Sequence, residues 1–222
     1  MFSKLMDVLS EEVADEEIVS FFIDDVVSCV EGVDAHNHIL KRIDKFAKDH
    51  KLKWGNSKCK VMPIGKHNKI NEWQFGEDTI QNSDKYKYLW DLITSDGKNK
   101  ENINDRKGKI TASTPSIRTI ATNEVLNKIE TPVLLELHER INVTNLINNA
   151  EAWSLSIGDR TEIEKIEINS LKNLFDLPIR TPTPAITYML GTLQTNIRID
   201  KKQLFYLHRI LGTTTTGQQK HC

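Results

Sequence analysis

The chain has 222 residues, of which 38% are hydrophobic and 27% are charged, and its formal net charge is -1. The apolar share suffices for a core, so the composition excludes a disordered chain, a collagen-like repeat and a disulfide framework. Three cysteines without a CxxC pair favour a reducing compartment. The acidic N-terminus does not resemble a secretory signal, and no apolar run is long enough for a membrane span. We therefore expect one large or two small intracellular domains, without distinguishing nucleus from cytoplasm.

Charge is segregated along the chain. Residues 1–34 contain one basic and ten acidic residues, whereas residues 41–69 contain ten basic and two acidic residues. Such a basic segment either faces an anionic partner, such as a phosphate backbone, or forms a solvated lysine-rich helix face. Charge alone favours the solvated face, so a nucleic-acid partner needs support from motifs.

The first part of the chain predicts mixed structure. Helical spacing of apolar residues predicts a helix over 2–14, and two β-rich runs at 18–23 and 26–30 predict strands joined at an acidic turn. Asp34 is the predicted cap of a second helix, whose apolar face contains Ile39, Ile43, Phe46 and Ala47. Further strands are predicted at 59–64, 70–75 and 86–93.

The second part predicts helices. Ile103, Ile110 and Ile117 are spaced by seven, although Pro115 is expected to weaken or kink a continuous helix. Thr131-Pro132 indicates a helix start, and Asp159 is the expected cap of a further helix that ends before Pro178. A stiff connector at 181–184 and a last helix over 200–211 complete the prediction.

Two adjacent aspartates, Asp24 and Asp25, lie between the two β-rich runs. Neighbouring like charges are costly unless a cation compensates them, and Mg²⁺ favours one or two carboxylates together with substrate phosphates. The alternative is a solvated turn, where Asp is common. The surrounding motifs decide between these interpretations.

Several motifs follow the aspartate pair in order. Phe22-Ile23-Asp24-Asp25, followed by an apolar strand, resembles the aromatic-x-Asp-Asp hairpin of reverse transcriptases. The later motifs, in the order and at the spacing of non-LTR (LINE-type) retrotransposon enzymes, are 52–62 with Lys58-Cys59-Lys60-Val61, 86–89 with 96–98, 150–153, 171–178 and 207–211. The chain is thus similar to the reverse transcriptases of non-LTR retrotransposons over most of residues 2–211.

This resemblance implies an α+β fold. The C-terminal half of a polymerase palm, an antiparallel sheet with packed helices, is expected at 1–96. A thumb-like helical region at 97–150, a post-thumb helical connector at 151–211 and a disordered tail at 212–222 would follow.

The resemblance also implies metal-assisted nucleotidyl transfer by an RNA-directed DNA polymerase that uses Mg²⁺ or Mn²⁺. Asp24 and Asp25 would be catalytic metal ligands, and Lys58 or Lys60 would lie near the triphosphate. The partners implied are an RNA or DNA primer–template and deoxynucleoside triphosphates. The residues expected to contact nucleic acid are Lys51, Lys53, Lys58, Lys60, Tyr88 and Leu89.

Family palms carry another metal-binding aspartate on a strand upstream of the hairpin, and only 23 residues precede Asp24. We therefore expect a truncated copy that does not polymerise alone. The alternative is a non-catalytic nucleic-acid-binding or interaction module derived from a retrotransposon.

Other motifs are interpreted as structural. His36-Asn37-His38 has the letters of a nuclease motif, but residues i and i+2 of a helix point in different directions. Cys59 is expected to be a buried strand thiol. The four tryptophans are scattered and are expected to pack in cores.

Overall fold

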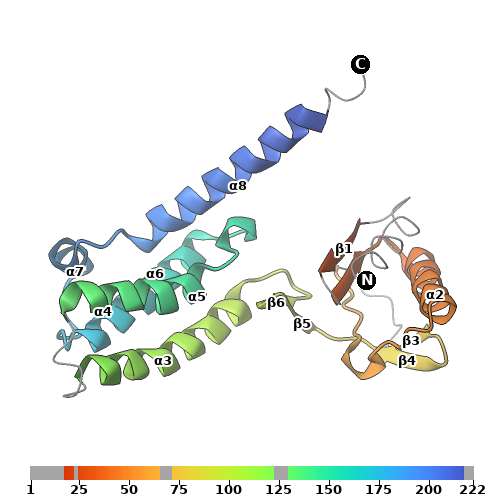
Figure 1. Cartoon of the computed structure of the whole chain (residues 1–222), viewed down its shortest axis with the longest axis horizontal. Helices are drawn as coiled ribbons and strands as arrows, with labels where there is room; N and C mark the ends of the chain where they lie inside the picture. Colours follow the sequence, from red (N-terminus) through yellow and green to blue (C-terminus); the bar gives the residue numbers. More distant parts are fainter. Residues whose placement is uncertain (1–17, 23–24, 66–71, 123–129, 218–222) are drawn as a thin grey trace. The chain divides into compact units, whose positions relative to one another are not determined.

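The computed structural model describes residues 18–22, 25–65, 72–122 and 130–217 (Figure 1). The chain divides into two compact units, Met1–Tyr86 and Lys87–Cys222. The first unit holds a helix and two hairpins and the second is mainly helical, which confirms the α+β class. The division falls upstream of the predicted boundary at 96, and the palm, thumb and connector assignments stay predictions. Within the described ranges, no helix is long and apolar enough to cross a membrane.

Strands β1 (Ile18–Phe22) and β2 (Asp25–Cys29) form an antiparallel ladder that pairs Phe22 with Asp25. The two predicted strands are thereby confirmed. The helix predicted over 2–14 and residue Asp24 lie outside the described residues.

Helix α2 (Val33–Asp49) supplies the centre of the first core. The predicted apolar stripe is confirmed, because Ile39, Ile43, Phe46 and Ala47 are all buried. The prediction that Asp34 caps this helix is wrong. Gly32 is the N-cap, and Asp34 lies in the first turn, where a carboxylate interacts favourably with the positive end of the helix dipole.

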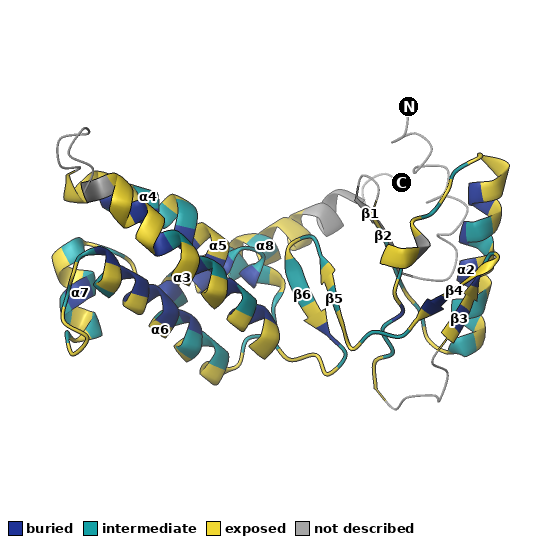
Figure 2. Cartoon of the chain, turned by 90° about the horizontal axis from the view of Figure 1, so that it is seen from below, coloured by how far each residue is buried: buried dark blue, intermediate teal, exposed yellow. Residues whose placement is uncertain are grey.

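A second hairpin covers α2. Strands β3 (Glu72–Phe75) and β4 (Asp78–Gln81) pair antiparallel, and alternation along them buries Trp73, Phe75 and Ile80 (Figure 2). These side chains pack with the α2 face and Val61 in one cluster. The turn at Gly76 is tight, because its φ is 63° and a Cβ there would lie 2.6 Å from Asp44 Oδ1.

The strand predicted over 59–64 is wrong. Only Val61 forms a bridge, parallel to Asn82, in which the Val61 amide donates to the Gln81 carbonyl at 3.3 Å. Pro63 has no N–H to continue a ladder, so pairing ends at once. The short 3₁₀ turn η1 (Asn56–Lys58) precedes this bridge.

The single strand predicted over 86–93 is also wrong. It folds as a hairpin of β5 (Lys85–Tyr88) and β6 (Asp91–Thr94), with Leu89 and Trp90 in the turn at positive φ. Each of the three ladders in the described chain has two strands, rather than forming one continuous sheet.

The helices that were predicted for the second unit occur in the predicted order, with altered ends. Pro132 in the first turn of α4 confirms the predicted helix start. Ser156, not Asp159, caps α6, and Asp159 completes a capping box by accepting from the Ser156 amide at 3.0 Å. The elements are α3 (Lys100–Thr122), α4 (Thr131–His138), the π-helical turn η3 (Glu139–Val143), α5 (Thr144–Ile147), η4 (Ala150–Ala152), α6 (Ile157–Leu174), α7 (Thr183–Leu190) and α8 (Thr195–Gly217).

Two predicted segments near the C-terminus differ from the structure. The expected connector at 181–184 contains the start of α7, with a proline in its first turn. Helix α8 starts before residue 200 and continues through Gly217, past the predicted start of the tail at 212. Residues 218–222 lie outside the described residues.

Helix α3 is continuous through Pro115. The proline removes the amide that would pair with the Thr111 carbonyl, but both residues are exposed, so water can replace that donor. Thr114 and Thr119 also donate to carbonyls one turn earlier, at 2.7 and 3.0 Å. The helix is therefore not interrupted at Pro115.

The second core lies mainly between α3 and α6. Ile103, Ile110 and Ile117 of α3 are 2–3% exposed. A polar cluster of Thr114, Asn142 and Ser170 lies within this apolar interface: the Asn142 amide donates to both hydroxyl oxygens, at 3.0 and 2.9 Å. Because each buried polar group has a partner, the cluster links α3, η3 and α6 without a desolvation penalty for an unpaired group.

Candidate nucleic-acid interface

The acidic hairpin offers one described carboxylate. Asp25 is exposed at the first position of β2, and the next residue, Val26, packs against the first core. No group of three or more His, Cys, Asp or Glu residues suited to a metal occurs in the described parts of the chain. Asp25 is therefore a single exposed carboxylate at this position, and the described residues do not form a protein-only metal cage.

The basic segment packs on the same core as the hairpin. Leu52, Trp54 and Cys59 are partly buried against that cluster, whereas Lys51 and Lys53 are exposed between them. Alternating apolar anchors and exposed ammonium groups hold the segment to the unit while its charge faces solvent. This geometry allows the lysines to contact an anionic polymer.

Lys51 has an unusual backbone. It ends α2 in a Schellman motif, in which the Leu52 amide donates to Ala47 O at 2.8 Å and the Lys51 amide to Lys48 O at 3.2 Å. Its φ is 54°, in the left-handed region that usually holds glycine. The motif directs the chain from α2 into the lysine segment.

Lys58 and Lys60 are exposed on either side of Cys59. The Lys58 amide donates to Gly55 O at 2.8 Å, which closes the short turn η1. The Cys59 thiol donates to the same carbonyl at 3.7 Å, and burial raises its pKa. Cys59 is thus a packed thiol, as expected, although not in a strand, and the two lysines present charge away from it.

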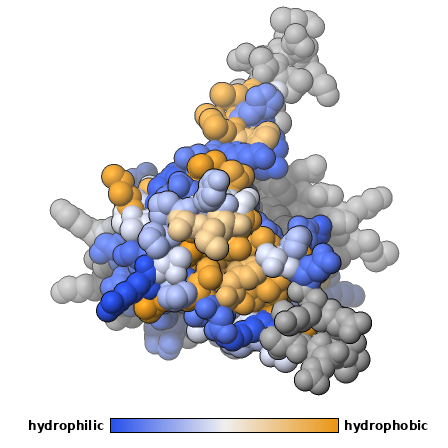
Figure 3. Space-filling view, turned by 90° about the vertical axis from the view of Figure 1, so that its left-hand side faces the viewer, coloured by the Kyte–Doolittle hydropathy of each residue, from blue (hydrophilic) through white to orange (hydrophobic). Residues whose placement is uncertain are grey.

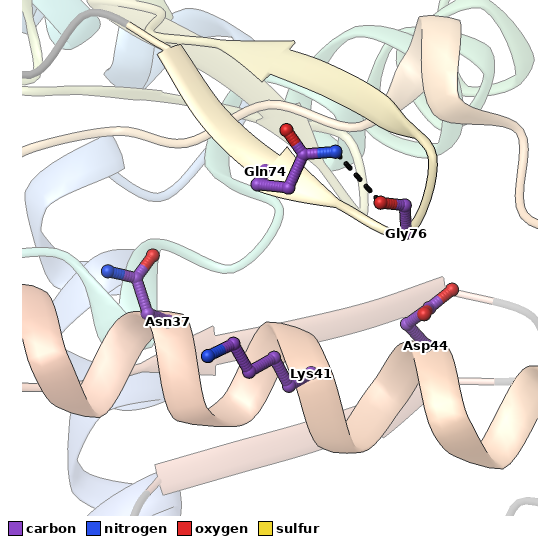
Figure 4. Close-up of a pocket in the computed structure, with 5 residues that line it drawn as sticks. All are labelled: Asn37, Lys41, Asp44, Gln74 and Gly76. Atoms are coloured by element: carbon purple, nitrogen blue, oxygen red, sulfur yellow. Dashed lines mark hydrogen bonds between the residues drawn. The ribbon is translucent and has the colours of Figure 1, made fainter.

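A shallow polar pocket of ≈ 380 Å³ lies between α2 and the β3–β4 turn (Figure 4). The predicted site residues Asp25, Lys58 and Lys60 do not line this pocket. The basic segment contributes the cation of Lys41 to its lining. On the hairpin side of the pocket, the Gln74 amide donates to Gly76 O at 2.8 Å. The lining residues are Asn37, Lys41, Asp44, Gln74 and Gly76.

The nuclease-like triplet has a packing role. His36 lies edge-on to Trp73, with ring centroids 4.5 Å apart, and burial lowers the pKa of His36. Its partner in the triplet, His38, lies on the same helix two residues later. The predicted structural interpretation of these residues agrees with this geometry.

In the second unit, the β5–β6 turn contains two predicted contact residues. Tyr88 is half-buried and its hydroxyl oxygen is buried without a hydrogen-bond partner in the described chain. Leu89 is half-buried, and its carbonyl accepts from Asn149 at 3.4 Å. The exposed groups at this turn are instead Lys87 and Trp90.

Sequence reasoning missed the network that holds this hairpin. The buried Arg106 guanidinium donates to Asp91 and to the Asn145 carbonyl, and it lies 4.4 Å from the centre of the Trp153 ring. Asn149 donates to the second Asp91 oxygen at 2.8 Å. A signal was available: Arg106 lies three residues after Ile103 and four before Ile110, on the apolar stripe of α3.

A second missed group of ionisable side chains lies between α4, α6 and α8. Burial lowers the pKa of His138 to about 4. Burial also raises the pKa of Glu167, which accepts a hydrogen bond from Thr195. Arg198 pairs with Glu139 and lies 3.9 Å from Glu167. The interactions of Arg198 and Thr195 link α8 to η3 and α6, and these groups do not form part of the predicted site.

Figure 3 shows a hydrophobic patch among polar side chains on the end of the second unit that carries α7. Tyr188 and Met189 of α7 are 90% and 69% exposed, and the neighbouring Ile179 and Leu193 are also exposed. The sequence did not predict this surface, because a connector at 181–184 and no helix was expected where α7 forms.

Comparison with known proteins supports the resemblance for the first part of the chain. A family model described as reverse transcriptase (RNA-dependent DNA polymerase) matches residues 1–89. The match spans β1–β5 and includes the acidic hairpin, the basic segment and Tyr88-Leu89. No curated protein and no solved structure matches the chain.

Proposed function

We propose that residues 1–89 are palm sequence of a reverse transcriptase of the non-LTR type, and that the chain binds a primer–template as part of RNA-directed DNA synthesis. The match of this stretch to the reverse-transcriptase family carries the proposal. The geometry supports it, because an acidic hairpin and a segment of exposed lysines pack on one core.

In this proposal each type of group acts through its own chemistry. Asp24 and Asp25 would hold Mg²⁺ (or Mn²⁺), an ion that neutralises charge on the transferring phosphate when bound. Lys58 and Lys60 would orient the triphosphate of a deoxynucleotide, and the exposed ammonium groups of Lys51 and Lys53 would pair with backbone phosphates.

The chain alone should bind primer–template without extending it. Two-metal transfer uses several carboxylates, and the described hairpin contributes Asp25. A primer-extension assay with Mg²⁺ or Mn²⁺ measures this. Product dependent on Asp24 and Asp25 would show that the chain is catalytically sufficient.

Binding is tested by titrating a labelled primer–template duplex at increasing salt. The slope of log K against log[salt] reports the phosphates neutralised, at about 0.9 per contact. Neutralising the four segment lysines to Gln should therefore reduce the slope by up to about 3.6. The matched control neutralises four exposed lysines of the second unit: Lys98, Lys100, Lys165 and Lys201.

Metal binding is measured separately by calorimetry with Mn²⁺. The Asp24→Asn/Asp25→Asn variant should lose the binding heat and keep the thermal midpoint of the wild type. Unchanged heats would refute the assignment of the metal ligands while leaving nucleic-acid binding intact.

The alternative is a nucleic-acid-binding module without catalysis. The exposure of Lys51, Lys53, Lys58 and Lys60 favours it, because phosphate contacts require no metal. Salt-sensitive duplex binding that is unaffected by Mn²⁺ and by the two aspartate substitutions would select this alternative.

A further inference from the structure

The β5–β6 turn carries a tryptophan where the backbone favours glycine. Leu89 and Trp90 have φ of 43° and 79°, so both central residues of this two-residue turn have positive φ. Asn-Gly and similar pairs are preferred in such turns because side chains are strained there. Strain of this kind persists where the surroundings hold it, and it clusters at sites that contact ligands.

The turn is held from both sides. Asn149 donates to the carbonyl of Leu89 and to the carboxylate of Asp91, and the buried Arg106 pairs with Asp91. Trp90 lies between the two anchored residues, yet its side chain is 70% exposed. The structure therefore anchors the chain on both sides of a largely exposed indole, although exposing it gains no burial energy.

A cation lies over this ring. Lys87 Nζ is 6.0 Å from the centre of the Trp90 ring, and Lys87 is exposed. An exposed aromatic ring with an ammonium group over one face matches one nucleotide, since a base can stack on the opposite face and its phosphate can pair with the cation. Every base has a π-face, so such a contact tolerates sequence.

We propose that Trp90 and Lys87 form a stacking site for an unpaired nucleotide of the bound nucleic acid. The inference rests on the proposed function, which supplies the class of ligand. Its aromatic member, Trp90, follows the stretch that matches the family model at 1–89, and Lys87 lies near the end of that stretch.

The test measures binding of the full chain to a labelled single-stranded oligonucleotide and to a blunt duplex of the same length. Replacing a stacking aromatic by alanine weakens binding by about 5- to 150-fold per base. We expect a loss in this range for Trp90→Ala on the single strand and little change on the duplex. Trp90→Phe should retain most of the affinity, and Lys87→Gln should lower the salt slope by about 0.7.

Two further variants separate stacking from structure. Trp90→Gly relieves the backbone strain, so it should raise the thermal midpoint while it weakens single-strand binding. Tyr188→Ala removes another exposed aromatic ring of the second unit, which is 90% exposed, and should leave binding unchanged. A stabilised variant with reduced affinity cannot be explained by misfolding.

The outcomes distinguish the two proposals. Equal single-strand affinity of Trp90→Ala and the wild type overturns the stacking site but leaves the proposed function. Equal losses on the single strand and the blunt duplex also overturn it, because a duplex presents few unpaired bases. If the wild type binds neither oligonucleotide, the proposed function fails and this inference fails with it.

Discussion

Replacing Arg106 by methionine should destabilise the second unit strongly. The Arg106 and Asp91 side chains are only 3% and 19% exposed, and the guanidinium also donates to Asn102 and to the Asn145 carbonyl. Removing one partner of a buried pair costs about 3–5 kcal/mol because the other charge is left uncompensated. Asp91 keeps the amide donor of Asn149 at 2.8 Å, so we expect a loss near the lower end, about 3 kcal/mol.

Urea unfolding of the full chain, followed by circular dichroism, measures this loss as a shift in midpoint. Lys98→Met is the matched control, because Lys98 pairs with Asp96 at 3.4 Å with side chains 75% and 55% exposed. An exposed pair contributes about 0–1 kcal/mol. The Asp91→Asn/Arg106→Met double variant should recover part of the loss by removing the unpaired charge. An Arg106→Met shift no larger than that of Lys98→Met would refute the reasoning.

Three further changes test other features. Burial holds the folded pKa of His138 at about 4, below its ordinary 6.5, so the unfolded chain takes up the proton first as pH falls. The free energy of unfolding of the wild type should therefore fall by about 3 kcal/mol between pH 6.5 and 4. Unfolding measured across this pH range should show no such loss for His138→Leu. The raised pKa of the buried Glu167 acts in the opposite direction, with stability lost as pH rises through it, so the difference between wild type and variant isolates the histidine. Lys51→Gly should raise the free energy of unfolding by about 1 kcal/mol, since glycine adopts the φ of 54° without strain. A lower thermal midpoint in this variant would contradict the left-handed conformation assigned to Lys51. Gly76→Ala should lower the thermal midpoint more than Gly97→Ala does, because φ is positive at both positions but nothing lies within 4 Å of a Cβ at Gly97. When Asp44→Ala is combined with Gly76→Ala, the additional drop in midpoint should disappear.

The local patterns of the chain predicted much of its secondary structure. The β-rich runs on either side of the aspartate pair form β1 and β2, and the apolar stripe of α2 is buried as its spacing predicted. Helix ends were less predictable. Ser156 and Asp159 are both good cap residues, and only the geometry of α6 shows that the first is the cap and the second its N3 partner.

Long-range contacts account for the main errors. The run over 86–93 looks like one strand, but Asn149 and Arg106 lie far along the chain and hold it as a hairpin. Pro115 was expected to weaken or kink the helix, yet α3 continues through it, and the Thr111 carbonyl that loses its donor is on an exposed residue. A tertiary partner or a solvent-facing position overrides local propensity in both cases.

The candidate site was predicted as residue types rather than as an arrangement. The order of motifs located Asp25 and the lysines, and the family match over 1–89 supports that order. The periodicity of a sequence does not show which side chain of a turn is exposed. Tyr88 was therefore predicted to contact nucleic acid, and the more exposed Trp90 was predicted to pack in a core. The positive φ of Trp90 was not visible in the sequence.

The polar cluster has a consequence for how α3 finds its position. Ile103, Ile110 and Ile117 repeat every seven residues, so an apolar interface built on them alone would look much the same after a slide of two turns along α6. Thr114 occurs once in that repeat, and its hydroxyl meets Asn142 and Ser170 only in the observed alignment. A slipped pairing would bury these groups without partners, so the cluster specifies one register between α3 and α6.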